Sequence, residues 1–128
     1  MSSESKSFSK PDQEFTQFNN AHMAHVNVGG QRVIKITLKP GWKWSNDVKP
    51  QIGTDSCQAT HIGVIMSGKI CARMDDGTEI KYSAGDAYHI SPVHDAWVEG
   101  DESVTAYQFG GEYLVRGGEY KCFEGEWK

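Results

Sequence analysis

Two segments of the chain constrain its fold more than any other feature. Residues 53–68 and residues 85–97 each open on a glycine, and each carries a histidine inside an otherwise apolar run. A hairpin lies between them, and its Asp76-Gly77 dipeptide is typical of a tight turn between antiparallel strands. Short strands joined by such turns predict antiparallel β-structure for this part of the chain.

The same alternation of strands and turns continues on both sides of these segments. Strand-like runs at 22–28 and 31–38 flank the Gly29-Gly30 dipeptide, and a further run covers 103–109. No segment keeps a helical period, and residues 47–53 are expected to form a loop. The 14 glycines suit many tight connections. The pattern therefore predicts an all-β sandwich or barrel.

The length of 128 residues fits a single domain with one hydrophobic core. Residues 1–20, which begin with a Ser/Lys-rich stretch, are expected to form a flexible N-terminal arm. Phe15 and Phe18 would give this arm apolar side chains to bury. Residues 21–128 are expected to form the β-domain, with a short C-terminal tail.

Composition excludes several classes of function. Lys and Arg number 13 against 17 Asp and Glu, and this mildly acidic balance argues against a nucleic-acid-binding surface. No run has the length of a membrane span, and the first ten residues lack the apolar region of a secretory signal. The 3 cysteines form no CxxC pair. We therefore expect a cytoplasmic protein without a disulfide framework.

The run from Cys57 to Met66 has two apolar faces. As a strand, it places Cys57, His61 and Ile65 on one face. The other face carries Ile62, Val64 and Met66. Both faces of the strand are therefore expected to be shielded from solvent. The domain interior would cover one face, and the N-terminal strands or a partner subunit the other. We expect a homodimer, because closed two-fold dimers are the commonest soluble oligomers.

The two glycine-bounded segments resemble the two short motifs of the cupin superfamily. The first cupin motif runs G-x5-H-x-H-x3/4-E-x6-G, and the second runs G-x5-P-x-G-x2-H-x3-N. Gly68 matches the closing glycine of the first motif, and Gly85 with Asp86 matches the opening of the second. This resemblance covers roughly residues 33–109. It implies a cupin jelly-roll β-barrel of the small, single-domain bacterial type.

In cupins, two histidines and a glutamate of the first motif and a histidine of the second bind one divalent metal. Here His61 falls at the glutamate position, Cys57 at the second histidine and Asp55 at the first. The fourth position falls on Ala96, and His94 lies two residues earlier. The resemblance therefore implies the barrel more strongly than the metal. His61, His94, Cys57 and Asp55 are the candidate ligands, and Zn, Fe, Mn or Ni the candidate metals.

Aromatic residues on separate strands indicate a ligand pocket. Such cavities are mostly apolar and aromatic, with a few converging polar groups. The alternative is that the aromatic rings only fill the hydrophobic core, and that His61 forms an ordinary hydrogen bond inside the barrel. The predicted pocket is lined by His61, His94, Trp97, Tyr107, Tyr88 and Trp44.

Three functions are compatible with these residues. The leading hypothesis is a cupin that binds a small molecule in the pocket, in a sensory or regulatory role. The second is a metal-dependent dioxygenase, isomerase or lyase in which His61 and His94 bind the metal and Cys57 or Asp55 completes its shell. The third uses His94, with Asp95 or His61, as a metal-free general acid and base.

Overall fold

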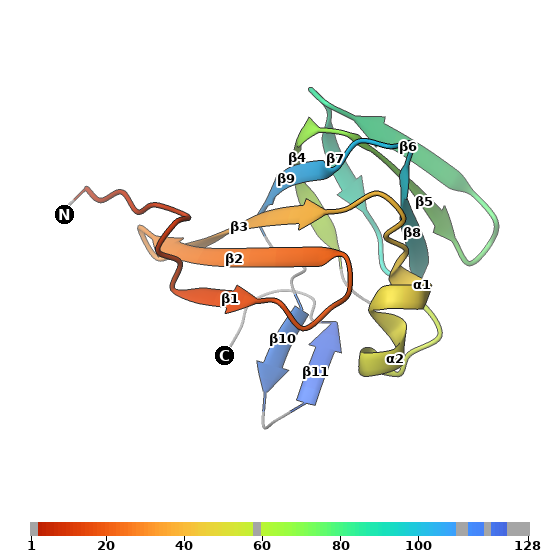
Figure 1. The fold of residues 1–128 in the computed structure, drawn as a ribbon, viewed down its shortest axis with the longest axis horizontal. Coiled ribbons are helices and arrows are strands. Elements are labelled where there is room, and N and C mark those ends of the chain that lie inside the picture. The colour runs from red at the N-terminus through yellow and green to blue at the C-terminus, as the bar shows by residue number, and fades with distance from the viewer. Residues whose placement is uncertain (1–2, 58–59, 110–112, 117–118, 123–128) are drawn as a thin grey trace.

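The computed structural model of the chain describes residues 3–57, 60–109, 113–116 and 119–122. Antiparallel strands dominate these residues and form two larger sheets, as the sequence predicted (Figure 1). The six-stranded sheet contains, in spatial order, β1 (Gln13–Phe15), β2 (Ala21–Val28), β3 (Gln31–Leu38), β9 (Val104–Gln108), β4 (His61–Ser67) and β7 (Ala87–Ile90). The three-stranded sheet contains β6 (Glu79–Ser83), β5 (Lys69–Met74) and β8 (His94–Glu99). A separate hairpin pairs β10 (Tyr113–Arg116) with β11 (Glu119–Cys122).

Both hairpins predicted from turn dipeptides are present. β2 pairs with β3 around Gly29-Gly30, and both glycines have the positive φ that a tight hairpin turn of matching twist requires. β5 pairs with β6 around the turn that contains Gly77. These local signals are reliable because few residues other than glycine adopt positive φ without strain.

The N-terminal segment differs from the expected flexible arm. Residues 13–15 form β1, which pairs with β2 at the edge of the six-stranded sheet. Phe15 and Phe18 are both buried in the core. The segment is ordered there because it gains backbone hydrogen bonds and buries two aromatic rings at once.

Two single-turn helices lie in this part of the chain: one falls within the loop expected at 47–53, and the other directly precedes it and overlaps it only at Asp47. They are α1 (Trp44–Asp47) and α2 (Lys49–Ile52), and α1 packs against β8 (Figure 1). Each is too short to show a helical period in the sequence. Among the described residues, no helix has the length and apolar character needed to cross a bilayer.

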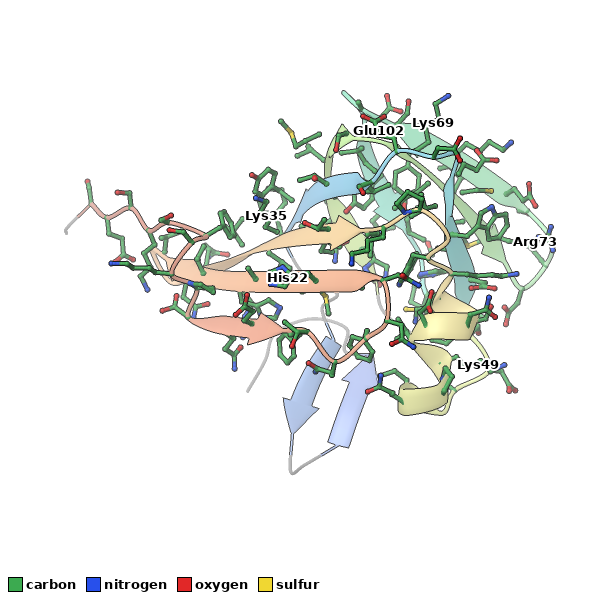
Figure 2. All side chains as sticks on the ribbon, viewed as in Figure 1. His22, Lys35, Lys49, Lys69, Arg73 and Glu102 are labelled. Carbon is green, nitrogen blue, oxygen red and sulfur yellow. The ribbon has the colours of Figure 1, made fainter. Side chains whose placement is uncertain are left out.

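The core lies between the two sheets. It contains fully buried side chains such as Ile34, Ile65 and Val104, together with Trp44 of α1. Charged side chains such as Lys69 and Arg73 point outward instead (Figure 2).

The outer face of β4 remains exposed in the single chain. Ile62 and Met66 lie on this strand, Phe109 follows β9, and all three are at least half exposed. The N-terminal Phe8 covers a different point of the outer surface by packing on Tyr107. The homodimer stays a prediction, and this apolar face is where a second copy would pack.

Candidate functional site

Three potential metal ligands meet where β4 and β8 begin. His61 is the first residue of β4, and His94 is the first residue of β8. Cys57 pairs with His94 in an isolated bridge, in which its backbone N–H donates to the His94 carbonyl at 2.7 Å. The sulfur and one ring nitrogen of each histidine all lie within 4.8 Å of one another. Cys57 Sγ and His61 Nε2 are 3.5 Å apart.

This convergence depends on where the strand begins. A straight strand would separate Cys57 from His61 by about 13 Å, because the rise is about 3.3 Å per residue. The strand predicted from Cys57 begins only at His61, and Cys57 is paired with the second sheet instead. Both side chains reach the same point, because Cys57 lies beside His94 rather than on the same straight strand as His61.

His94 is oriented by a backbone hydrogen bond. Its Nδ1–H donates to the carbonyl oxygen of Ser91 at 2.6 Å, which leaves Nε2 with the lone pair that a metal requires. Burial on its own lowers the pKa of His94. Cys57, the Ser91 carbonyl and Asp95 together outweigh burial, so the pKa of His94 is raised above its ordinary value.

The donor set fits a divalent metal. A thiolate and two imidazoles suit Zn²⁺ in particular, and three protein ligands leave one tetrahedral position open. Among the described residues these three form the group that could hold an ion. Asp55, the fourth candidate from the sequence, does not join them. Its side chain is fully exposed, and its carboxylate lies 4.0 Å from Lys49 Nζ.

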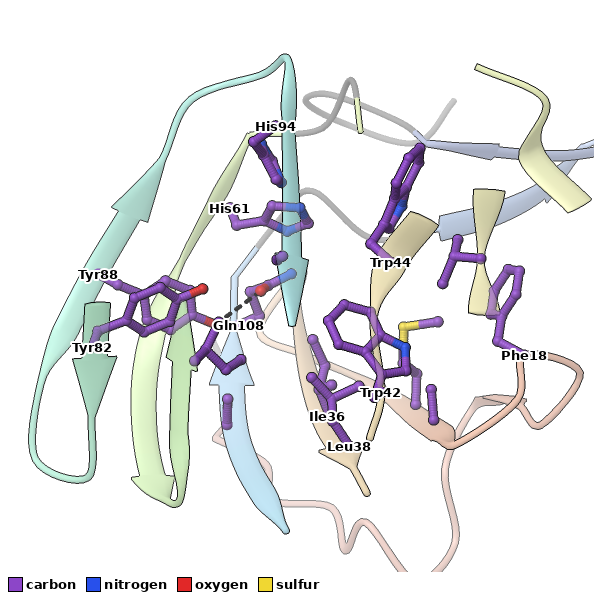
Figure 3. A pocket seen from close by; sticks show the side chains of 16 residues that line it. Phe18, Ile36, Leu38, Trp42, Trp44, His61, Tyr82, Tyr88, His94 and Gln108 are labelled. Atoms are coloured by element: carbon purple, nitrogen blue, oxygen red, sulfur yellow. Dashed lines mark hydrogen bonds between the residues drawn. The ribbon is translucent and has the colours of Figure 1, made fainter. Parts of the chain in front are cut away.

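A cavity of about 60 Å³ adjoins the two histidines. Its walls come from both sheets and from α1, and they are mostly apolar and aromatic (Figure 3). Tyr82 and Tyr88 stack on one wall with ring centroids 4.6 Å apart. Tyr88 Oη donates to Gln108 Oε1 at 2.8 Å. Burial raises the pKa of both tyrosines, so they stay neutral at physiological pH.

Four of the six residues predicted to line the pocket do so, namely His61, His94, Tyr88 and Trp44. Trp97 and Tyr107 lie elsewhere. Buried and partly exposed residues alternate along β8, so Trp97 lies on the face opposite to His94. The charged groups of Lys43 and Arg73 each lie 5.5 Å from the centre of the Trp97 ring. Tyr107 likewise faces outward from β9, beside Phe8. Trp97 lies three residues from His94, so strand alternation could have excluded it.

The sequence-based reasoning missed Trp42, Tyr82 and Gln108 as lining residues. Trp42 carried a usable signal, because it stands two residues before Trp44. Gln108 carried one as well, since in the sequence it alternates with the aromatic residues Tyr107 and Phe109 and therefore falls on the opposite face of an extended chain. Tyr82 carried none, because its place depends on how the two sheets pack.

Asp95 of β8 forms hydrogen bonds with Ser45 of α1, next to Trp44 in the cavity wall. Its carboxylate accepts hydrogen bonds from the backbone N–H of Ser45 at 3.1 Å and from the Ser45 hydroxyl at 2.8 Å. The backbone bond satisfies an N–H at the start of a helix, which has no partner within the helix. Trp44 is almost completely buried as a result.

No model of a protein family matches the sequence, and no curated protein matches it. Solved structures match the fold. A protein of unknown function from Vibrio parahaemolyticus has a TM-score of 0.55 and 14% identity, over 76% of this chain and 95% of its own. A cupin-like protein from Thermotoga maritima has a TM-score of 0.51 and 17% identity, over 77% of this chain and 74% of its own.

An RmlC-like cupin from Shewanella frigidimarina has a TM-score of 0.51 and 12% identity, over 76% of this chain and 82% of its own. The chain has a cupin-like fold. At these identities the likeness concerns the fold alone, so the chemistry of this cupin-like chain must be argued from its own residues.

Proposed function

We propose that this cupin-like protein binds a small molecule in its cavity, next to a divalent metal held by Cys57, His61 and His94. The observation that carries the proposal is the convergence of one sulfur and two ring nitrogens within 4.8 Å, and both histidines also line the cavity. In this proposal the two sheets form the jelly-roll barrel of the cupins, and the site lies inside it.

The surroundings of the three donors support a metal. Cys57 and His94 are almost completely buried, and the carbonyl of Ser91 fixes the orientation of the His94 ring. Backbone carbonyls commonly orient metal-binding histidines in this way. A buried thiolate also gains greatly from a cation, because its own charge is otherwise poorly solvated.

The metal would supply a Lewis-acidic open position for an oxygen or nitrogen atom of the ligand. The chain's own residues would do the rest. The aromatic walls exclude water and bind the apolar part of the ligand, and the hydrogen-bonded pair of Tyr88 and Gln108 offers polar contacts.

A metal-dependent enzyme is the second candidate. The observation that favours it is the number of ligands, since structural zinc sites are closed by four protein ligands and catalytic sites keep three. The dioxygenase, isomerase and lyase classes are the candidates. Turnover of a substrate by the metal-loaded protein would distinguish this function from binding alone.

Elemental analysis of protein purified without a histidine tag tests the metal. We expect about one ion per chain in the wild type, and its loss in Cys57→Ala, His61→Ala and His94→Ala. Cys71→Ala is the matched control for the thiol, because Cys71 is also buried and free but does not belong to the cluster. His22→Ala is the corresponding histidine control.

Reconstitution with Co²⁺ tests the ligand set independently. A thiolate-to-cobalt charge-transfer band should appear in the wild type and in Cys71→Ala, and should be missing in Cys57→Ala. Absence of bound metal after reconstitution with each candidate ion would refute the proposed site. Retention of the metal in the three site variants would also refute it.

A further inference from the structure

The hydroxyl of Tyr82 is a hydrogen-bond donor that the fold leaves unused at the cavity wall. Tyr82 lines the cavity and is only 9% exposed, and its ring stacks on that of Tyr88. The Tyr88 hydroxyl donates to Gln108, whereas that of Tyr82 has no hydrogen-bond partner among the described residues. The Tyr82 oxygen does not belong to the partnerless polar atoms that are sealed from solvent in the described part of the chain. It therefore stays accessible to a small molecule.

This hydroxyl is directed into the domain, toward the proposed metal site. Tyr82 is the buried residue of β6, and the three residues before it on this strand are exposed. Figure 3 shows the rings of Tyr82 and Tyr88 side by side, with their hydroxyl ends on the side of Gln108 and the histidines. Burial raises the pKa of Tyr82, and the nearby Cys57 sulfur adds to the effect. The phenol therefore stays protonated and can donate a hydrogen bond.

The charge of the proposed metal site favours an anionic ligand. When the Cys57 thiolate and the neutral rings of His61 and His94 hold a divalent cation, one positive charge remains uncompensated. None of the described Asp, Glu, Lys or Arg side chains lines the cavity, so the chain supplies no counter-charge there. A net charge in apolar surroundings costs free energy. A ligand with a single negative charge removes this cost, whereas a neutral ligand does not.

The cavity also restricts the size of the ligand. A water needs about 10–15 Å³ in a cavity measured this way. The volume of about 60 Å³ therefore suits a molecule of roughly four to six heavy atoms. Most of the walls are apolar, so the part of the ligand beyond its charged group should be a short hydrocarbon chain.

We propose that Tyr82 selects a small monocarboxylate, one oxygen of which takes the open metal position while the other accepts a hydrogen bond from the Tyr82 hydroxyl. The inference rests on the proposed function, because it names the ligand class of the same cavity. A carboxylate fits both contacts, since each of its oxygens carries lone pairs. A hydrogen bond to an ionised acceptor is also stronger than one between neutral groups.

Calorimetric titration of the Zn²⁺-loaded protein tests the inference. The probes are propionate, propionamide, which has the same shape without the charge, and benzoate, which has the same charge but exceeds the cavity in size. Wild type is compared with Tyr82→Phe and with Tyr107→Phe, the control variant, because Tyr107 faces outward beside Phe8. Elemental analysis and urea melts of each variant separate a loss of affinity from a loss of metal or of folding.

We expect wild type and Tyr107→Phe to bind propionate at least about ten-fold more tightly than propionamide or benzoate. Tyr82→Phe should keep its metal and its stability, because its hydroxyl makes no hydrogen bond with the described residues. It should bind propionate about ten-fold more weakly, as expected for a lost hydrogen bond to a charged group. In the Co²⁺ protein, propionate should shift the visible d–d bands, which would show that the carboxylate reaches the metal.

Equal affinity of wild type and Tyr82→Phe for propionate would overturn the inference. Equal affinity of the wild type for propionate and propionamide would do the same, and that outcome does not depend on any variant folding. Metal-loaded protein that fails to bind propionate would overturn the inference and leave the metal site standing. Protein that takes up no metal would refute the proposed function, and this inference with it, and elemental analysis alone identifies that case.

Discussion

His25 gives the chain a predictable sensitivity to acid. This residue of β2 is completely buried beside Phe15, and neither of its ring nitrogens has a hydrogen-bond partner among the described residues. Burial lowers the pKa of His25 from 6.5 to about 4, and the positive charge of Arg32 adds to the effect. The folded protein therefore keeps this imidazole neutral where the unfolded chain would protonate it.

The sign and size of the effect follow from these two values. Below about pH 6.5 the unfolded state binds a proton that the folded state does not, so the free energy of unfolding falls as the pH falls. The contribution of His25 to the free energy of unfolding is lost completely below about pH 4. The difference between these two pKa values corresponds to about 3 kcal/mol of stability, of which about 2 kcal/mol is lost by pH 5.

Urea denaturation followed by tryptophan fluorescence between pH 7.5 and 4.5 measures this loss. The wild type is compared with His25→Leu, which removes the titrating group and replaces it with an apolar side chain of similar volume. His22→Leu is the matched control, because His22 lies on the same strand but is exposed and paired with Glu14. All proteins are measured metal-free, so that protonation of the metal ligands does not contribute.

We expect the wild type and His22→Leu to lose about 2 kcal/mol more than His25→Leu between pH 7.5 and pH 5. The difference between wild type and His25→Leu isolates the histidine, since carboxylates titrate equally in both. Parallel pH profiles for these two proteins would refute the reasoning. The result would mean that His25 is protonated as easily in the folded protein as in the unfolded chain.

Two further predictions concern the packing around the cavity. Gly63→Ala should lower the free energy of unfolding by about 3 kcal/mol in urea melts, because the new Cβ would overlap the Tyr107 carbonyl and lie 2.9 Å from Tyr88 Oη. Gly77→Ala, with open space around the site but a positive φ, should cost only about 1 kcal/mol, and equal costs would contradict the steric explanation. Tyr88→Phe should cost about 1–2 kcal/mol because it removes the buried hydrogen bond that the Tyr88 hydroxyl donates to Gln108, whereas the outward-facing Tyr107→Phe should cost almost nothing. A neutral Tyr88→Phe would show that this hydrogen bond does not contribute to stability.

Much of the fold and part of the site could be predicted from local sequence signals. The glycine turns at 29–30 and 77 defined two hairpins, because backbone conformation there depends on the residue itself. The cupin-like motif segments singled out His61 and His94, which the structure brings together beside the cavity. The one-turn helices could not be predicted, because their stability comes from contacts such as that of Ser45 with Asp95 rather than from a repeating pattern.

The alternation of strands and turns, the cupin-like frame and the thiol and imidazole donors within it can all be recognised in the amino-acid sequence. Which of these donors meet depends on how the two sheets pack against each other. Cys57 joins His61 because it pairs with His94 across the two sheets, and Asp55 is excluded because it precedes that bridge and points into solvent. The packing of the two sheets also places Trp42 and Trp44 in the cavity wall while Trp97 faces outward. These outcomes depend on how two sheets pack, and packing joins residues whose separation along the chain carries no local signal.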